Sequence, residues 1–269
     1  MRQRKVKNLE EKLQAVSAWM VEDPAPERWE RVFAAAGEPA DAERDLFLEI
    51  GCGRGDFILQ QALEHPDYNY IGIEGQPSVV LRAMEKAAQI DAALEKGSRP
   101  ERLQNVAERA GSAKADTQDT QDTQNDAQRD TTWTIRRTAL RNVLFSCTFV
   151  NRMDELFAPD SLSGIYLNFS DPWPKARHAK RRLTWRGRLQ DYAKALRHRG
   201  FIAVKTDNDA LFDFTLEEIE ACGWVPVELT RDLHGPDGKQ YDARRIMTEY
   251  ERKFREAGKN INYVKVVVL

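Results

Sequence analysis

Short apolar runs alternate with longer amphipathic stretches along most of this chain of 269 residues. The apolar runs are rich in β-branched and aromatic residues, which is typical of buried strands. The predicted strands are residues 46–50, 68–73, 142–148, 164–169, 201–205, 225–229 and 263–268. The predicted helices between them are residues 56–64, 78–89, 183–198, 209–221 and 248–256. This alternation predicts an α/β fold, with a mostly parallel sheet and helices on both faces.

Two regions lie outside this alternation. Residues 1–40 are predicted to form an N-terminal helical extension, with helices at about 9–20 and 27–36, ahead of a domain that spans residues 41–269. Residues from about 97 to 130 carry repeated Asp-Thr-Gln triplets and lack apolar periodicity. Such a segment cannot bury enough apolar surface to offset its ordering entropy, so we expect a disordered insert. A tolerated loop insertion is favoured over an acidic segment that occupies a basic surface of the protein.

Composition narrows the class of protein. Hydrophobic residues make up 41% of the chain, which supports a real core, and no stretch is long and apolar enough to span a membrane. The basic N-terminus is followed by polar residues, unlike a signal peptide. The three cysteines lie far apart and the four histidines lack metal-ligand spacing. These features predict a cytoplasmic protein with reduced thiols and without a metal site.

A glycine-rich turn joins the first predicted strand of the domain to its first helix. Residues 49–55 read EIGCGRG, and Glu74 follows the next strand. The GxGxG spacing differs from the GxGxxG of dinucleotide binders, and the GK[ST] of a nucleotide P-loop does not follow. Glu49 would repel a pyrophosphate but suits the ammonium and sulfonium of S-adenosylmethionine, while Glu74 can accept hydrogen bonds from ribose hydroxyls. S-adenosylmethionine is therefore favoured over a nicotinamide or flavin cofactor.

A second candidate site begins where the apolar residues 164–167 end. Residues 168–175 read NFSDPWPK, with a lysine as the last residue. Six more cations follow before any acidic residue: Arg177, Lys180, Arg181, Arg182, Arg186 and Arg188. Seven like charges repel one another on an isolated helix, so a polyanion partner is favoured over a solvated helix face. The net charge of −2 argues mildly against nucleic acid, but the acidic insert hides this local basic patch.

Asp171 is the candidate catalytic acid in this segment. Methylation of a ring nitrogen such as N7 of guanine places positive charge on the purine, and a nearby carboxylate stabilises that charge. Enzymes that methylate exocyclic amines in DNA share a [DNS]-P-P-[YFW] motif, which is not met here because Trp173 separates the two prolines. Asp171 could also be an acid in a proline-rich turn, and Trp173 could stack on a base or pack beneath the loop.

These motifs resemble those of a known family. Residues 49–55 are similar to motif I of class I methyltransferases. Residues 168–175, with His178 and the KRRLT of residues 180–184, resemble the signature of the bacterial tRNA (guanine-N7-)-methyltransferase family, the TrmB type. The TEYE of residues 248–251 resembles the T-x-[FY]-E element of that family. The resemblance covers the chain from the first predicted strand of the domain onward, apart from the insert.

The resemblance implies a Rossmann-like fold with a seven-stranded sheet. It also implies that the protein transfers a methyl group from S-adenosylmethionine to N7 of guanine in tRNA, at position 46 of the variable loop. The implied cofactor-binding residues are Glu49, Gly51, Gly53, Gly55, Glu74, Asn151 and Asp171, the last of which is also the implied catalytic residue. The implied substrate-binding residues are Lys175, Asp207, Thr248, Glu249, Tyr250 and Glu251. The implied RNA contacts are Arg177, His178, Lys180, Arg181 and Arg182.

Two other functions stay open at this point. One is methylation of another RNA position or of a small molecule with the same cofactor. The other is RNA binding without catalysis, which the intact Glu49, Glu74 and Asp171 disfavour. The sequence also leaves open whether the protein is a monomer or a homodimer, and whether the N-terminal helices cover the crevice or add to RNA binding.

Overall fold

The computed structural model describes residues 6–26, 28–35, 44–97 and 139–268 of the chain. The predicted insert, from residue 98 onward, lies outside the described residues.

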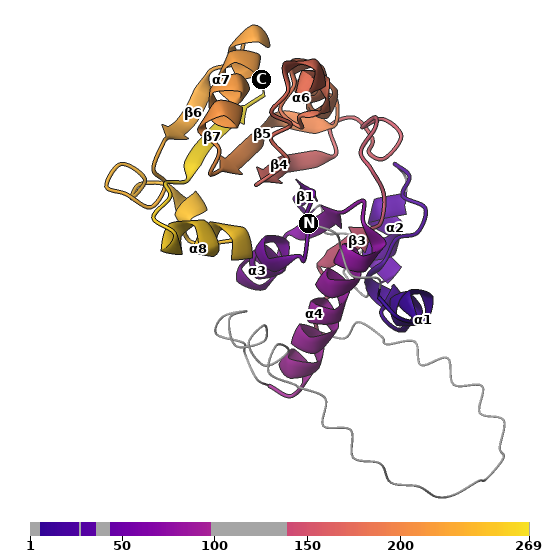
Figure 1. The fold of residues 1–269 in the computed structure, drawn as a ribbon. Helices are drawn as coiled ribbons and strands as arrows, with labels where there is room; N and C mark the ends of the chain where they lie inside the picture. The colour runs from indigo at the N-terminus through magenta and orange to yellow at the C-terminus, as the bar shows by residue number, and fades with distance from the viewer. Residues whose placement is uncertain (1–5, 27, 36–43, 98–138, 269) are drawn as a thin grey trace, which may run out of the picture.

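Seven strands form one sheet in the order β3-β2-β1-β4-β5-β7-β6 (Figure 1). The strands are β1 (Leu46–Ile50), β2 (Asn69–Ile73), β3 (Val143–Ser146), β4 (Leu162–Asn168), β5 (Leu196–Thr206), β6 (Pro226–Thr230) and β7 (Asn262–Val267). Strands β1 to β5 pair in parallel, and β7 runs antiparallel to both β5 and β6. The prediction of a mostly parallel sheet is confirmed.

Helices cover both faces of this sheet, as the sequence predicts. The helices of the domain are α3 (Asp56–Glu64), α4 (Pro77–Glu95), α6 (Arg186–Ala193), α7 (Asp209–Ala221) and α8 (Glu249–Glu256). Neighbouring residues on β1 belong to different cores: Phe47 packs with residues of α3 and α4, and Leu48 with residues of α6 and α7. The side chains of β1 are therefore covered by helices on both faces of the sheet.

The N-terminal region packs onto the domain. It contains α1 (Leu9–Ala15), the 3₁₀ helix η1 (Ser17–Trp19) and α2 (Arg28–Ala35). The Trp19 side chain is fully buried, and Met20 forms a parallel bridge with Phe145 at the outer edge of β3. Val21 then donates its N–H to the carbonyl of Phe145 at 2.8 Å. Within the described residues, none of the helices is both long and apolar enough to cross a membrane.

The predicted helix over residues 183–198 is wrong at both ends. The 3₁₀ helix η2 (Ala176–Arg181) precedes it, α6 ends at Ala193, and β5 already starts at Leu196. Leu196 pairs with Leu162 on β4, its side chain is 4% exposed, and a register shift follows before Gly164. Burial of this leucine against the neighbouring strand outweighs the helical propensity of the surrounding lysine, alanine and arginine residues.

Candidate active site

A cleft of about 790 Å³ opens at the carboxyl ends of β1, β2, β4 and β5. This is the edge where ligands bind in open α/β sheets, and the chain reverses its strand order there, between β1 and β4. The predicted site residues that line the cleft are Glu49, Gly51, Gly53, Glu74, Asn151, Asp171, Arg181, Asp207, Thr248, Glu249 and Tyr250. Those outside its lining are Gly55, Lys175, Arg177, His178, Lys180, Arg182 and Glu251.

The three glycines of the turn after β1 all have a left-handed backbone conformation, but their structural roles differ. Gly51 and Gly53 have φ values of 76° and 56°, and a Cβ on either would meet no atom within 4 Å. They leave room for a ligand close to the backbone. Gly55 has a φ of 75°, and a Cβ there would lie 2.8 Å from the Cβ of Ala83 on α4. Gly55 therefore allows the start of α3 to pack closely on α4.

Glu74 braces the same turn from the end of β2. Its Oε2 accepts from the N–H of Gly53 at 3.2 Å, and its Oε1 accepts from the N–H of Gln76 at 3.0 Å. The N–H groups of Gly51 and Cys52 both donate to the carbonyl of Ile73 at the end of β2, at 2.8 and 3.0 Å. The carboxylate that is predicted to bind ribose is thus also part of the frame that shapes the turn.

Glu49 is a buried carboxyl group with one unsatisfied oxygen. Its Oε1 accepts from Nδ2 of Asn168 at 2.8 Å, while Oε2 has no hydrogen-bond partner among the described residues. Only 2% of the residue is exposed, and burial raises the pKa of Glu49 to about 8, against the opposing hydrogen bond from Asn168. A cationic or hydrogen-bonding ligand group would satisfy this oxygen and stabilise the ionised form. The residue therefore fits the ammonium end of S-adenosylmethionine.

Phe149 is a cleft residue that no motif in the sequence predicts. It follows β3, is 63% exposed and lines the cleft beside Asn151. Its ring lies over Gly75, where a Cβ would approach Cε1 of Phe149 to 2.2 Å. The only signal in the sequence is a single aromatic residue after a strand, and its partner glycine lies 74 positions earlier in the chain. An exposed ring on this side of the cleft suits the face of an adenine.

Asp171 lies in the segment of residues 169–175 between β4 and η2, which is the Asp171 turn. It is exposed and lines the cleft, and the turn around it contains two non-glycine residues with left-handed backbone, Phe169 (φ 52°) and Trp173 (φ 40°). Such conformations are costly and tend to persist at functional sites. The Trp173 ring also lines the cleft, with the Arg181 guanidinium 5.0 Å from its centroid.

The start of α8 forms another wall of the cleft. Tyr250 stacks with Phe254 at 6.4 Å between centroids, and Phe254 lies 5.9 Å from Phe169. All three rings line the cleft and offer flat surfaces to a base. Asp207 lines it too, and its Oδ2 pairs with Nζ of Lys259 at 2.7 Å.

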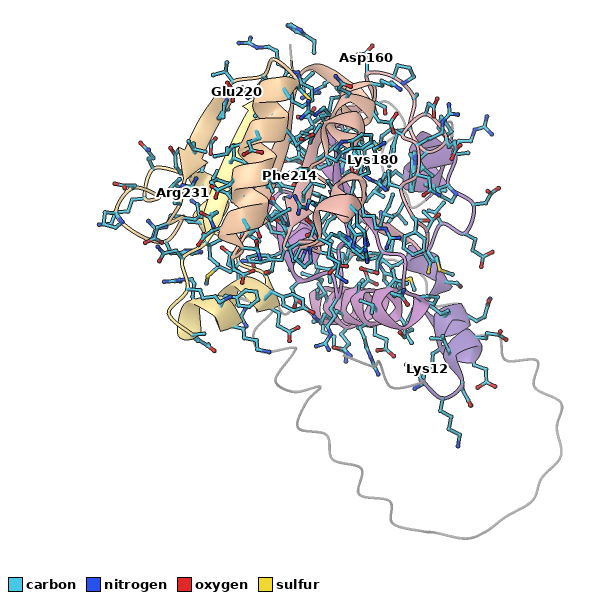
Figure 2. All side chains as sticks on the ribbon, turned by 45° about the horizontal axis from the view of Figure 1, so that its top comes forward. Lys12, Asp160, Lys180, Phe214, Glu220 and Arg231 are labelled. Atoms are coloured by element: carbon cyan, nitrogen blue, oxygen red, sulfur yellow. The ribbon has the colours of Figure 1, made fainter. Side chains whose placement is uncertain are left out.

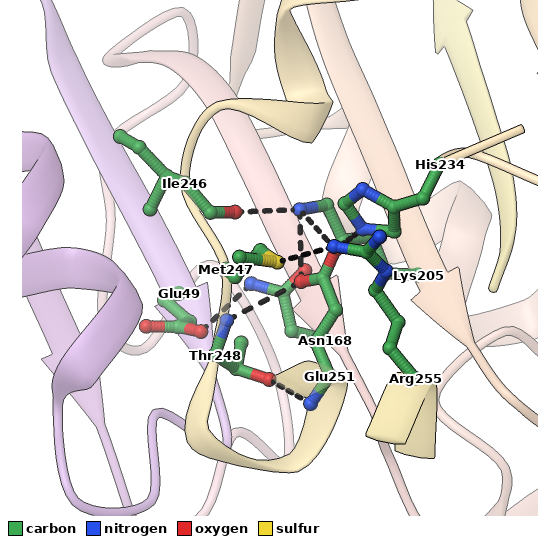
Figure 3. A network of polar contacts seen from close by, with 9 residues as sticks. All are labelled: Glu49, Asn168, Lys205, His234, Ile246, Met247, Thr248, Glu251 and Arg255. Carbon is green, nitrogen blue, oxygen red and sulfur yellow. Dashed lines mark hydrogen bonds and ion pairs between the residues drawn. The ribbon is translucent and has the colours of Figure 1, made fainter. Parts of the chain in front are cut away.

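Glu251 sits in a buried polar network beneath this wall (Figure 3). Its Oε2 lies 3.1 Å from Nζ of Lys205 on β5, and its Oε1 lies 2.6 Å from Nε2 of His234. Thr248 caps the N-terminus of α8, and its N–H in turn donates to Glu251. Burial would raise the pKa of Glu251, but the charge of Lys205 and the hydrogen bond from His234 outweigh it, so the pKa is lowered. Both carboxylate oxygens thus hold α8 on the sheet.

The cations of the basic run divide into two groups. Three bind other groups of the protein: Arg182 donates to the carbonyls of Pro172 and Trp173, Arg186 pairs with Glu218, and Arg188 donates to the carbonyl of Val150. Four are exposed and form no ion pair with any described residue: Lys175, Arg177, Lys180 and Arg181. The second group is the exposed basic patch, and it borders the turn that carries Asp171.

The sheet order, with a cleft at its carboxyl edge, is that of the class I methyltransferase fold. A family model described as "Putative methyltransferase" matches residues 43–119 and 121–264. A protein from Mesoplasma florum named tRNA (guanine-N(7)-)-methyltransferase is 37% identical over 82% of this chain and 79% of its own length. One of the same name from Lachnoclostridium phytofermentans is 33% identical over 92% and 90%. The chain therefore belongs to the bacterial tRNA (guanine-N7-)-methyltransferase family, as its motifs predict.

Solved structures agree on the fold. A crystal structure of the 16S rRNA methyltransferase KamB superposes with a TM-score of 0.54 at 10% identity, and the match covers 92% of this chain and 99% of that one. At that level of identity the likeness concerns the fold alone, and it confirms the predicted fold class.

Proposed function

We propose that the chain transfers a methyl group from S-adenosylmethionine to N7 of a guanine in the variable loop of tRNA, at position 46. The observation that carries the proposal is that one cleft contains two carboxylates with different surroundings. Glu49 at the end of β1 is buried with one unsatisfied oxygen, and Asp171 after β4 is exposed. The two strands are hydrogen-bonded neighbours, so a donor at one and an acceptor at the other would meet between them.

The donor side would be formed by the ends of β1, β2 and β3. Glu49 would accept hydrogen bonds from the ammonium group, and Glu74 from the ribose hydroxyls. Phe149 and Asn151 would contact the adenine, while Gly51 and Gly53 leave space for the chain between these groups. When bound there, S-adenosylmethionine supplies a methyl group on a positively charged sulfur, which needs no metal or acid for its activation.

The acceptor side would be formed by the turn after β4 and by α8. N7 of guanine has a free lone pair, so the protein need not remove a proton from it. Asp171 would accept from N–H groups of the base and stabilise the positive charge that develops on the purine. Asp207, Thr248, Glu249 and Tyr250 would hold the guanine in line with the methyl group. Lys175, which lies outside the lining of the cleft, would hold the substrate from the exposed basic patch. Glu251 would act one layer below, by fixing α8.

The exposed basic patch would hold the tRNA backbone. Its lysine and arginine side chains can each neutralise a phosphate, and every such contact adds salt-dependent affinity. Because the patch borders the Asp171 turn, a backbone bound there would present a base to the cleft, after the base has left its stack.

The experiment that tests this proposal is a map of the methylated position. A tRNA transcript is methylated with the purified protein, reduced and cleaved with aniline at N7-methylguanine, and the fragments are sized. We expect one cleavage, in the variable loop, and none in a matched transcript with adenine at that position. Cleavage elsewhere, or cleavage that survives the substitution, would contradict the assigned position.

A further inference from the structure

We propose that Arg182 is a positioning residue that holds the turn carrying Asp171, and is not a phosphate ligand. Its Nε donates to the carbonyl of Pro172 at 3.0 Å, and its Nη2 donates to the carbonyl of Trp173 at 3.1 Å. The two bonds occupy one edge of the guanidinium and reach two consecutive carbonyls. These are the first two residues after Asp171, so the contact lies one peptide away from the implied catalytic group. The inference rests on the proposed function for its catalytic consequence.

The backbone of this turn needs such a contact. Phe169 and Trp173 stand on either side of Asp171, and both have left-handed φ values that side chains other than glycine rarely adopt. Such residues stay in place only where their surroundings hold them. Phe169 is held by its N–H, which donates to the carbonyl of Lys205 at 2.8 Å. Arg182 holds Trp173 on the other side.

Arg182 is itself anchored to α7. Its guanidinium carbon lies 4.2 Å from the ring centroid of Phe214, which Figure 2 labels on α7. The chain that follows is tied to the same helix by Thr184, which accepts from Oγ1 of Thr215 at 2.8 Å, and by Arg186, which pairs with Glu218. Three alternate residues of this segment thus contact side chains of α7. The Arg182 guanidinium therefore links the Asp171 turn to α7.

The neighbouring Arg181 differs from Arg182 although both belong to the same basic run. Arg181 is exposed, lines the cleft and forms no ion pair with a described residue, whereas Arg182 is half-buried. A guanidinium whose edge is taken up by two carbonyls and whose face is covered by a ring presents little to a phosphate. Adjacent residues in the KRR sequence therefore have different tasks.

The test compares Arg182→Lys with Arg231→Lys. Arg231 is a matched control because it also covers a ring on α7, that of Phe212 at 5.3 Å, while its ion pair with Asp213 is exposed. Lysine keeps the charge but cannot bridge two carbonyls as the planar guanidinium does. We expect Arg182→Lys to lower the methyl-transfer rate at saturating tRNA and cofactor by roughly tenfold to a hundredfold. Its tRNA affinity and the salt dependence of that affinity should stay within about twofold, and Arg231→Lys should match the wild type.

Lys180→Ala should show the opposite result, with tRNA binding affected instead of the saturating rate. As a phosphate contact, Lys180 should on removal weaken tRNA binding and reduce the salt slope by about one. A wild-type rate in Arg182→Lys would overturn the inference, and so would an Arg182→Ala variant that loses salt slope with its saturating rate intact.

Amide hydrogen exchange tests the inference without any turnover. Arg182→Lys should exchange faster than the wild type in peptides that cover residues 169–174, and Lys180→Ala and Arg231→Lys should not. Unchanged exchange in this turn would overturn the positioning role even if the protein proved to methylate another base. Faster exchange together with a different methylated nucleoside would instead refute the proposed function and leave the positioning role standing.

Discussion

Glu49 and Asp171 show how two carboxylates of one cleft take different roles from their surroundings. Glu49 is 2% exposed, and one of its oxygens accepts a hydrogen bond from Asn168, whereas Asp171 is exposed in a turn. Burial makes the charge of Glu49 costly until a cation arrives, so it suits recognition of a positively charged donor. Asp171 carries no such cost, so it can face a base whose charge develops only during the reaction.

Cofactor binding should depend on pH through Glu49. Its pKa of about 8 in the folded protein exceeds the usual 4.5, so below pH 8 a cationic ligand must displace a proton. We expect the affinity for S-adenosylmethionine to rise with pH towards about 8 and then level off, with net proton release below that value. Calorimetry in buffers of different ionisation enthalpy measures both quantities.

Glu49→Gln is the control, because it keeps the shape and cannot titrate. The part of the pH dependence that the ligand itself causes should remain in this variant, and the rising part should vanish. Without cofactor, the raised pKa means that the folded state holds its proton more tightly than the unfolded state. The free energy of unfolding of the wild type should therefore fall relative to Glu49→Gln between pH 4.5 and about 8. Equal pH profiles would refute the assignment.

At the scale of elements, the sequence predicts most strands and helices closely. The ranges of β1, α3 and α7 agree with the predicted ones, because each combines a clear period with a glycine, asparagine or aspartate at its boundary. The end of α6 could not be predicted, since it depends on Leu196 finding Leu162 on another strand. A local sequence pattern carries no information about a strand partner that lies far away in the chain.

Gly55 tests how α3 and α4 pack. Gly55→Ala should lower the free energy of unfolding in two ways, through the left-handed backbone and through the approach of the new Cβ to Ala83 at 2.8 Å. Gly223→Ala is a matched control, because Gly223 has the same φ of 75° and open space around it. We expect a loss of about 1–2 kcal/mol in the control and a further ~1–3 kcal/mol in Gly55→Ala. Chemical denaturation measures both, and equal losses would contradict the packing role.

The buried network under α8 should govern the stability of that helix. Glu251→Gln leaves the Lys205 ammonium buried without its counter-charge, and we expect a loss of about 3–5 kcal/mol in the free energy of unfolding. Because the pKa of Glu251 is lowered in the folded state, the wild type should lose this contribution only as pH falls below its usual 4.5. Glu256→Gln, an exposed position at the end of α8, should change little. A small loss in both variants would show that the network is dispensable.

At the scale of the whole molecule, the sheet order brings together what the chain keeps apart. Glu49, Asp171 and Tyr250 come from distant parts of the sequence, yet all line one cleft. The grouping of Glu49 with Asp171 could be predicted, because motifs at the carboxyl ends of parallel strands share one edge. Tyr250, on α8, is implied only by the family resemblance. The groups that each side chain contacts in the folded protein could not be predicted. Arg181 and Arg182 look alike in sequence but differ in burial and contacts, because Arg182 packs on Phe214 of α7 whereas Arg181 lies over the Trp173 ring at the cleft.

The most direct test of the proposed function is the identity of the nucleoside that receives the methyl group. Purified protein is incubated with labelled S-adenosylmethionine and unmodified tRNA, the tRNA is digested, and the nucleosides are separated. We expect label in 7-methylguanosine alone. We also expect a transfer rate roughly 10²–10³-fold lower in Asp171→Asn. Label in another nucleoside, or full activity in Asp171→Asn, would contradict the proposed function.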